Sequence, residues 1–124
     1  MPDQQQSIVV VEDDAGMRKA LERLLRAGGF QCMSFASAEA LLQAGAADTA
    51  ACLVLDVHLP GLSGFQLQRQ LMASGQKSPV IFITAHDDAA ARAEARRIGS
   101  VAYFRKPFDG KVFLSEIVRA LKGN

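Results

Sequence analysis

Side chains that can carry out chemistry follow four separate apolar runs of this 124-residue chain. They comprise three consecutive acids, a lone aspartate, a threonine and a lysine: Glu12, Asp13, Asp14, Asp56, Thr84 and Lys106. A carboxylate can act as a nucleophile toward phosphorus, while an ammonium group and a hydroxyl can bind phosphoryl oxygens. This combination indicates phosphoryl transfer onto an aspartate.

The acidic residues also indicate a divalent cation. Carboxylates that lie within a few ångströms of one another raise each other's pKa unless a cation lies among them. Oxygen ligands suit a hard ion, and Mg²⁺ in particular binds one or two carboxylates together with water and phosphate. We therefore expect Mg²⁺ as the cofactor.

Five apolar runs must position these side chains. They cover residues 7–11, 30–35, 51–55, 80–83 and 101–104, and segments with helical spacing separate them. The connections are too long for hairpins, so the pattern predicts an α/β fold with a parallel sheet and helices on both faces. Functional groups of such sheets lie past the carboxyl ends of the strands, where the chain reverses direction. The second run alone lacks such a group, since Ala36 follows it, which predicts a doubly wound (βα)5 flavodoxin-like sheet with strand order 2-1-3-4-5.

Residues that begin and end helices lie between the runs. Side chains that can accept hydrogen bonds from a first helical turn precede four of the helical segments: Asp14, Ser37, Asp87 or Asp88, and Asp109. Gly45 and Gly99 are expected to end two of these helices. The last helix is expected to reach about Lys122, close to the end of the sequence.

The composition is that of an ordinary globular domain. Apolar residues make up 49% and charged residues 22%, and we expect a single domain over residues 1–124, structured over about 7–122. The formal net charge of +1 gives no electrostatic reason for direct binding to nucleic acid or to a membrane. Cys32 and Cys52 lack the spacing of a metal or redox pair and are expected to be buried in a reducing compartment. The first residues do not form a secretory signal, so we expect a cytoplasmic protein.

Four stretches of the sequence resemble one known family. They are IVVVEDD, LVLDVHLPGLSGFQL, VIFITAH and VAYFRKPF, and each contains one of the strand-end groups. Together they resemble the response-regulator receiver domain of two-component signalling, which has a CheY-like fold, from Ile8 to about Leu121. The stretches SAEALL and RKPFDGKVFLSEI are most similar to receivers of LuxR-type (NarL/FixJ group) DNA-binding regulators.

The resemblance assigns roles in phosphoryl transfer. It implies that Asp56 is the phospho-acceptor and that Thr84 and Lys106 bind the phosphoryl group. Thr84 would move inward when that group arrives, and Tyr103 would turn inward with it as the aromatic switch. The peptide bond between Lys106 and Pro107 would be cis.

The resemblance also implies a metal site. Glu12 and Asp13 would hold Mg²⁺ together with Asp56 and the backbone carbonyl of His58. Many relatives have two aspartates where this chain has Glu12 and Asp13. The additional methylene of Glu12 lets its carboxylate reach the ion through a water molecule.

Two histidines are particular to this chain. His58 lies two positions after Asp56, and His86 lies two positions after Thr84. In the family these positions influence how fast the phosphoryl group is lost to water. We expect the pair to set the lifetime of the phosphorylated state, by steric cover or by orienting water.

The implied function is a signalling switch and not a metabolic enzyme. A histidine kinase or a histidine phosphotransfer protein would donate the phosphoryl group, and the new conformation would control an output protein or, in a longer regulator, a DNA-binding domain. The helix before the fifth run carries Arg92, Arg96 and Arg97, and the face that Arg92 and Arg96 share is either a solvated face or a docking site for an acidic partner. Residues of the last helix that do not cover the sheet could form an output surface or a phosphorylation-dependent dimer, and the candidates are Val112, Phe113, Ile117 and Leu121.

Three other functions fit these residues less well. A Mg²⁺-dependent phosphatase that forms an aspartyl-phosphate generally has a second carboxylate two residues after the nucleophile, where this chain has His58. A flavodoxin-like cofactor carrier needs a phosphate-binding loop after the first strand, where the acidic residues of this chain would repel phosphate. A receiver-like interaction module that is never phosphorylated would not need Asp56, Thr84 and Lys106 together.

Overall fold

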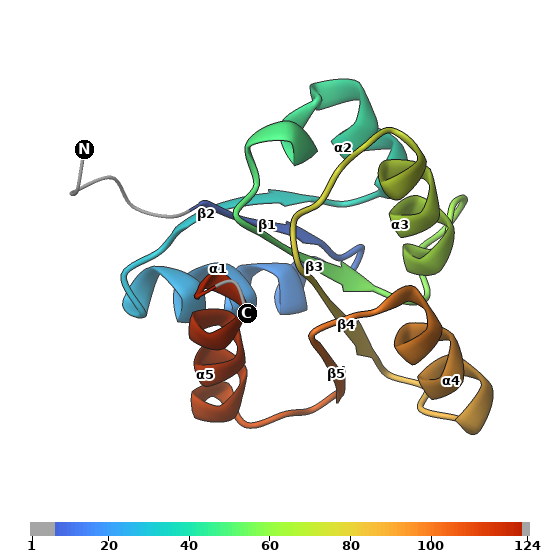
Figure 1. Ribbon diagram of the computed structural model, residues 1–124. Helices are drawn as coiled ribbons and strands as arrows, with labels where there is room; N and C mark the ends of the chain where they lie inside the picture. Colours follow the sequence, from blue (N-terminus) through green and yellow to red (C-terminus); the bar gives the residue numbers. More distant parts are fainter. Residues whose placement is uncertain (1–6, 123–124) are drawn as a thin grey trace.

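The strands of this computed structural model, which describes residues 7–122, form a five-stranded sheet in the order β2-β1-β3-β4-β5 (Figure 1). Every neighbouring pair is parallel. The strands are β1 (Ser7–Val11), β2 (Gln31–Phe35), β3 (Cys52–Asp56), β4 (Val80–Thr84) and β5 (Ala102–Arg105). The predicted doubly wound α/β fold and its strand order are confirmed.

Helices cover both faces of this sheet (Figure 1). They are α1 (Ala15–Ala27), α2 (Ala38–Ala44), α3 (Gly64–Ala73), α4 (Ala89–Ile98) and α5 (Gly110–Leu121). Helices α1 and α5 pack on one face, and α2, α3 and α4 pack on the other. A short 3₁₀ helix, η1 (Ala46–Thr49), was not predicted, because four residues are too few to show a helical period.

Successive side chains of a strand point to opposite faces, so each central strand supplies two hydrophobic cores. In β1, Val9 and Val11 belong to the core beneath α2, α3 and α4, whereas Ile8 and Val10 belong to the core beneath α1 and α5. Residues of β3 and β4 alternate in the same way. Burial on both faces explains why these strands read as continuous apolar runs.

Hydrogen-bonding side chains begin the helices as expected. Asp14 accepts from the backbone N–H of Met17, and Ser37 accepts from that of Ala40. The cap of α4 is Asp88, whose carboxylate accepts from the N–H of Ala91, so Asp87 is free for other contacts. Asp109 caps α5 by accepting from the first backbone N–H groups of that helix.

Both cysteines are free thiols. Cys52 is buried as predicted, but Cys32 is only half-buried, because β2 is an edge strand covered mainly on one side. Burial raises the pKa of Cys52 to about 12 and that of Cys32 to about 11, so both thiols stay protonated at neutral pH. Within residues 7–122, no helix combines the length and the apolar character needed to cross a bilayer.

Candidate functional site

The strand register brings the expected chemical groups to one edge of the sheet. Val11 of β1 pairs with Leu55 of β3, so the residues that follow them, Glu12 and Asp56, lie side by side. Thr84, the last residue of β4, pairs with Arg105 of β5. Lys106, which follows Arg105, therefore lies just beyond the same edge. The site lies where β1 and β3 adjoin and the direction of chain winding reverses, as expected for a ligand site of this fold.

Lys106 joins two of the carboxylates. Its ammonium group donates a hydrogen bond to Oε1 of Glu12 at 2.6 Å and another to Oδ2 of Asp56 at 2.8 Å. Glu12 is 0% exposed and Asp56 is 4% exposed. Buried charges of this kind require partners, and here one cation serves both acids. The hydrogen bonds to Asp56 and Glu12 raise the pKa of Lys106 against the opposing effect of its burial.

Glu12 titrates in the neutral range. Burial raises its pKa to about 7, although hydrogen bonds from Lys106 and from the backbone N–H of Asp14 oppose the shift. Both carboxylate oxygens are occupied, since Oε2 accepts from the N–H of Asp14 at 3.0 Å while Oε1 accepts from Lys106. Glu12 therefore contributes a carboxylate whose two oxygens are already hydrogen-bonded.

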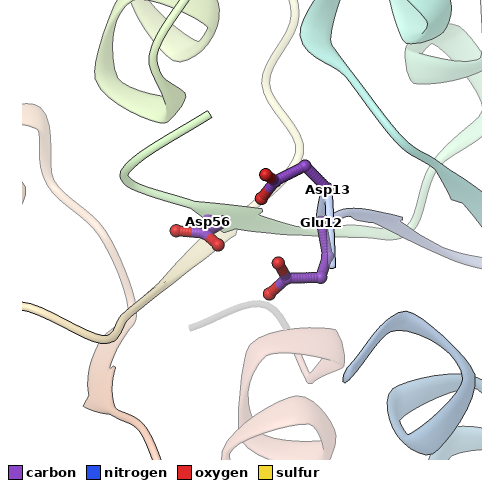
Figure 2. A group of neighbouring side chains, drawn as sticks. All are labelled: Glu12, Asp13 and Asp56. Atoms are coloured by element: carbon purple, nitrogen blue, oxygen red, sulfur yellow. The ribbon is translucent and has the colours of Figure 1, made fainter. Parts of the chain in front are cut away.

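Three carboxylates meet at this edge of the sheet. Glu12, Asp13 and Asp56 each offer an oxygen, and these oxygens lie within 4.8 Å of one another. Figure 2 shows that Glu12 and Asp13 come from consecutive positions at the end of β1 and that Asp56 comes from the neighbouring strand. When all are ionised, three carboxylates and one ammonium group leave a charge of about −2. An all-oxygen donor set with this charge fits Mg²⁺.

The hydroxyl of Thr84 makes two contacts with one residue. It donates to the backbone carbonyl of His86 at 3.0 Å and accepts from the backbone N–H of His86 at 3.0 Å. Thr84 is completely buried. Its hydroxyl is therefore held by the β4–α4 connection and has no bond to Asp56.

The two histidines of the chain contact each other. Their ring centres are 5.4 Å apart and the planes are nearly perpendicular, at 81°. Both rings are exposed, while the backbone N–H of His58 donates to Oδ1 of Asp56 at 2.9 Å. The two histidines are thus neighbours in space, and the backbone of one of them, His58, contacts the carboxylate of Asp56.

Tyr103 lies half-buried on β5, an edge strand. Its hydroxyl donates to Oδ1 of Asp87 at 3.2 Å. Burial and the adjacent charge of Asp87 raise the pKa of Tyr103 to about 12. The expected switch residue is therefore tied to the β4–α4 connection, which also contains the partner of Thr84.

Two residues that support the site were missed in the sequence. Arg18 of α1 donates to the backbone carbonyl of Glu12 at 2.8 Å and to that of Asp13 at 3.5 Å, which fixes the acidic turn. A Cβ at Gly64 would overlap the carbonyl oxygen of Asp56, so α3 begins against the acceptor strand only because this residue is glycine. Both roles depend on contacts with backbone atoms, which every residue type has, so such contacts leave no motif in the sequence.

The surfaces proposed for partners are partly as expected. Arg92 and Arg96 are exposed on α4. On α5, Phe113 and Ile117 are fully buried against the sheet, so they cannot belong to an output surface. Leu121 is half-buried. Val112 is 50% exposed, and Val118, which was not among the predicted surface residues, is 42% exposed.

The peptide bond between Lys106 and Pro107 is cis, as the resemblance implied.

Comparison of the sequence with known families matches residues 8–118 to the family described as the response regulator receiver domain. The curated relatives include nodulation protein W of Bradyrhizobium diazoefficiens, 42% identical over 113 residues, which cover 91% of this chain and 50% of that protein. They also include the response regulator protein TmoT of Ectopseudomonas mendocina, 38% identical over 122 residues, 98% of this chain and 56% of that protein. The transcriptional regulatory protein FixJ of Azorhizobium caulinodans is 35% identical over 112 residues, 90% of this chain and 53% of that protein. The chain thus spans about half the length of these relatives.

Solved structures agree with these matches. The crystal structure of FixJ-N has a TM-score of 0.86 and 35% identity, and the match covers 98% of this chain and 97% of that one. A response regulator receiver protein from Burkholderia phymatum has a TM-score of 0.83 and 40% identity, with 95% of this chain and 96% of that one covered. The expected similarity to receivers of the NarL/FixJ group is confirmed.

Proposed function

Because the chain belongs to the response regulator receiver domain family, we propose that it accepts a phosphoryl group on Asp56 in a two-component phosphorelay and that the described residues form one receiver domain. One observation carries this proposal: a nearly buried aspartate, bonded to Lys106, lies among carboxylates that suit a divalent ion. A carboxylate that served only the fold would not need two further acids at its side, because their repulsion destabilises the unliganded site.

In the proposed reaction a carboxylate oxygen of Asp56 attacks the phosphorus of a phosphohistidine. A P–O bond to Asp56 forms as the P–N bond to the donor imidazole breaks, and the proton that the imidazole needs comes from solvent or from the donor protein. Lys106 stays paired to the carboxylate and can bind the oxygens of the incoming group. The same residues allow hydrolysis of the aspartyl-phosphate, so the changed conformation lasts only as long as the phosphoryl group, and no metabolite is made.

Asp13 and Asp56 would hold Mg²⁺ together with the backbone carbonyl of His58, and Glu12 would contribute through water. The ion would supply positive charge that offsets the repulsion between the acceptor carboxylate and the phosphoryl group. The protein's own part is to keep the donors together, which Arg18 does by holding the carbonyls of Glu12 and Asp13.

The switch proposed for this chain begins at Thr84. A phosphoryl group on Asp56 offers new acceptor oxygens, and the hydroxyl of Thr84 would exchange its bonds to His86 for one of them. Tyr103 would follow, since its partner Asp87 lies in the same connection. The rings of His58 and His86 would cover the modified aspartate and set how long the phosphoryl group survives.

The partners follow from this role. A histidine kinase or a histidine phosphotransfer protein is the donor, in the cytoplasm, and the conformational change controls an output protein or domain. FixJ is named a transcriptional regulatory protein and is longer than this chain, which supports control of transcription through such a domain. The chain itself is not proposed to bind nucleic acid or membranes. Exposed residues of α5 such as Val112 suit a phosphorylation-dependent dimer.

Intact-mass analysis tests the proposal. The protein is incubated with acetyl phosphate and Mg²⁺, and the Asp56→Asn variant is treated in parallel. The wild type should gain the mass of one phosphoryl group, and Asp56→Asn should gain none. An unmodified wild type, or a gain that survives the substitution, contradicts Asp56 as the acceptor.

A further inference from the structure

Asp87 and Arg92 hold Tyr103 from two directions. The carboxylate of Asp87 accepts from the phenol hydroxyl, while the guanidinium carbon of Arg92 lies 5.7 Å from the centre of the tyrosine ring. Arg92 also pairs with Asp87, and its Nε donates to Oδ1 at 2.8 Å. The three side chains form a closed set of contacts, so moving one requires breaking bonds to both others.

This set of contacts is joined to Thr84 by a short piece of chain. The hydroxyl of Thr84 bonds to both backbone groups of His86, the residue directly before Asp87. Displacement of Thr84 therefore acts on the position of Asp87. Since Asp88 caps α4, Asp87 is not needed to begin that helix. Its carboxylate instead accepts hydrogen bonds from Arg92 and Tyr103.

We propose that Asp87 and Arg92 are positioning residues that keep Tyr103 in its present place beside α4 until the β4–α4 connection moves. This inference rests on the proposed function, because it concerns the equilibrium between the unphosphorylated and the phosphorylated conformations. The contacts stabilise the first of these conformations and none of them involves Asp56. Removing them lowers the free energy needed to reach the second, so ligands that favour it should bind more tightly.

The charges around Tyr103 are compatible with a contact that persists at neutral pH. The hydrogen bond from Arg92 holds the pKa of Asp87 below its usual value, with Arg105 acting in the same direction. Asp88 adds a further negative charge near the phenol. The carboxylate of Asp87 therefore remains ionised, and the phenol remains protonated as its donor.

The first experiment measures beryllium fluoride binding in the presence of Mg²⁺ by calorimetry, with beryllium fluoride as the phosphoryl analogue. The variants are Asp87→Ala and Arg92→Ala, and the control is Arg96→Ala, an exposed arginine on the same helix. Each of the first two should raise the apparent affinity by about twofold to fivefold. Arg92→Ala removes the cation–π contact and the ion pair, and Asp87→Ala removes the ion pair and the hydrogen bond from the phenol. Arg96→Ala should leave it unchanged.

The second experiment asks whether the effect passes through the tyrosine. In a Tyr103→Ala background, Arg92→Ala should no longer change the affinity, since the ring that it holds is gone. A merely structural role of Arg92 would give the same change in both backgrounds. The chain has 1 tyrosine and 0 tryptophans, so the ultraviolet titration of the phenol reports Tyr103 alone. Its midpoint should be lower in Asp87→Ala than in the wild type, because the charge and the hydrogen bond of Asp87 both raise the pKa of Tyr103.

The outcomes separate the two proposals. If the wild type binds no beryllium fluoride, or if Asp56→Asn binds it equally well, the proposed function fails and this inference fails with it. If the wild type binds in an Asp56-dependent way but Arg92→Ala and Arg96→Ala are equal, only the role of Asp87 and Arg92 is overturned. An unchanged phenol titration in Asp87→Ala would overturn the contact itself.

Discussion

The ammonium group of Lys106 lies 2.6 Å from a carboxylate oxygen of Glu12, although 94 positions separate the two residues in the sequence. The same ammonium group reaches Asp56. A divalent ion that entered the acidic cluster would meet a positive charge already bonded to two of the carboxylates. Lys106 and the ion therefore compete for the same carboxylate oxygens, and this competition can be measured.

Replacing Lys106 by methionine should separate metal binding from phosphoryl transfer. At pH 8, Lys106→Met should bind Mg²⁺ more tightly by roughly threefold to tenfold, because a competing charge is removed. Acetyl phosphate should modify Asp56 more slowly, by about 100-fold or more, because a fixed cation is missing where charge develops. Calorimetry and intact-mass time courses measure the two effects. The control is Lys111→Met, which changes an exposed lysine of α5. Weaker Mg²⁺ binding by Lys106→Met would contradict the competition.

The buried carboxyl of Glu12 should make stability depend on pH. Its folded-state pKa of about 7 lies above the ordinary value of 4.5. Between pH 4.5 and pH 7, therefore, Glu12 keeps its proton in the folded protein but has lost it in the unfolded chain. The free energy of unfolding should therefore fall as the pH rises from about 4.5 to 7, by roughly 1 to 3 kcal/mol for this group.

Urea unfolding at a series of pH values, without divalent ions, measures this loss. The variant Glu12→Gln cannot ionise, so its unfolding free energy should decline less over the same range. Mg²⁺ should restore stability to the wild type mainly above pH 7, where the carboxylates are ionised. Parallel pH profiles for the wild type and Glu12→Gln would show that Glu12 is not the group responsible.

The histidine pair should govern the lifetime of the aspartyl-phosphate. The rings contact each other, and the backbone N–H of His58 bonds to Asp56, so we expect removal of either ring to expose the modified carboxylate to water or to remove a group that orients water. We expect His58→Ala and His86→Ala each to change the dephosphorylation rate by about threefold or more, with the double variant less than additive because the rings are in contact. Decay of the phosphorylated mass after removal of acetyl phosphate gives the rates. Rates identical to the wild type in both variants would end this interpretation.

Gly64 should tolerate no side chain. A methyl group there would overlap the carbonyl of Asp56, which belongs to the rigid central strand β3. Gly64→Ala should lower the free energy of unfolding by about 1–3 kcal/mol and slow phosphorylation by displacing the acceptor. Gly16→Ala in α1 is the matched control, since its methyl group would meet only an ordinary contact with the side chain of Asp14. Equal stabilities of the two variants in urea would contradict the steric role.

Much of the fold was predictable because each signal is local. Burial of β1, β3 and β4 on both faces makes each a continuous apolar run, and the ends of the helices are marked by side chains such as Ser37 that bond within a few residues. The short helix η1 and the half-exposure of Cys32 were not predictable, because they depend on what packs against a segment and not on the segment itself.

The sequence by itself determined which chemical groups the protein has and that they stand at strand ends: carboxylates, a hydroxyl and an amine in the order of the chain. Only the tertiary structure decided which of these groups touch. Parallel register placed Glu12 beside Asp56, and the cis turn at Pro107 accompanies a lysine bonded to both. The same structure tied Thr84 to His86 and Tyr103 to Asp87 and Arg92. Hydrogen bonds and pKa values depend on distances of a few ångströms and on exclusion of water, and these arise only when distant segments pack together.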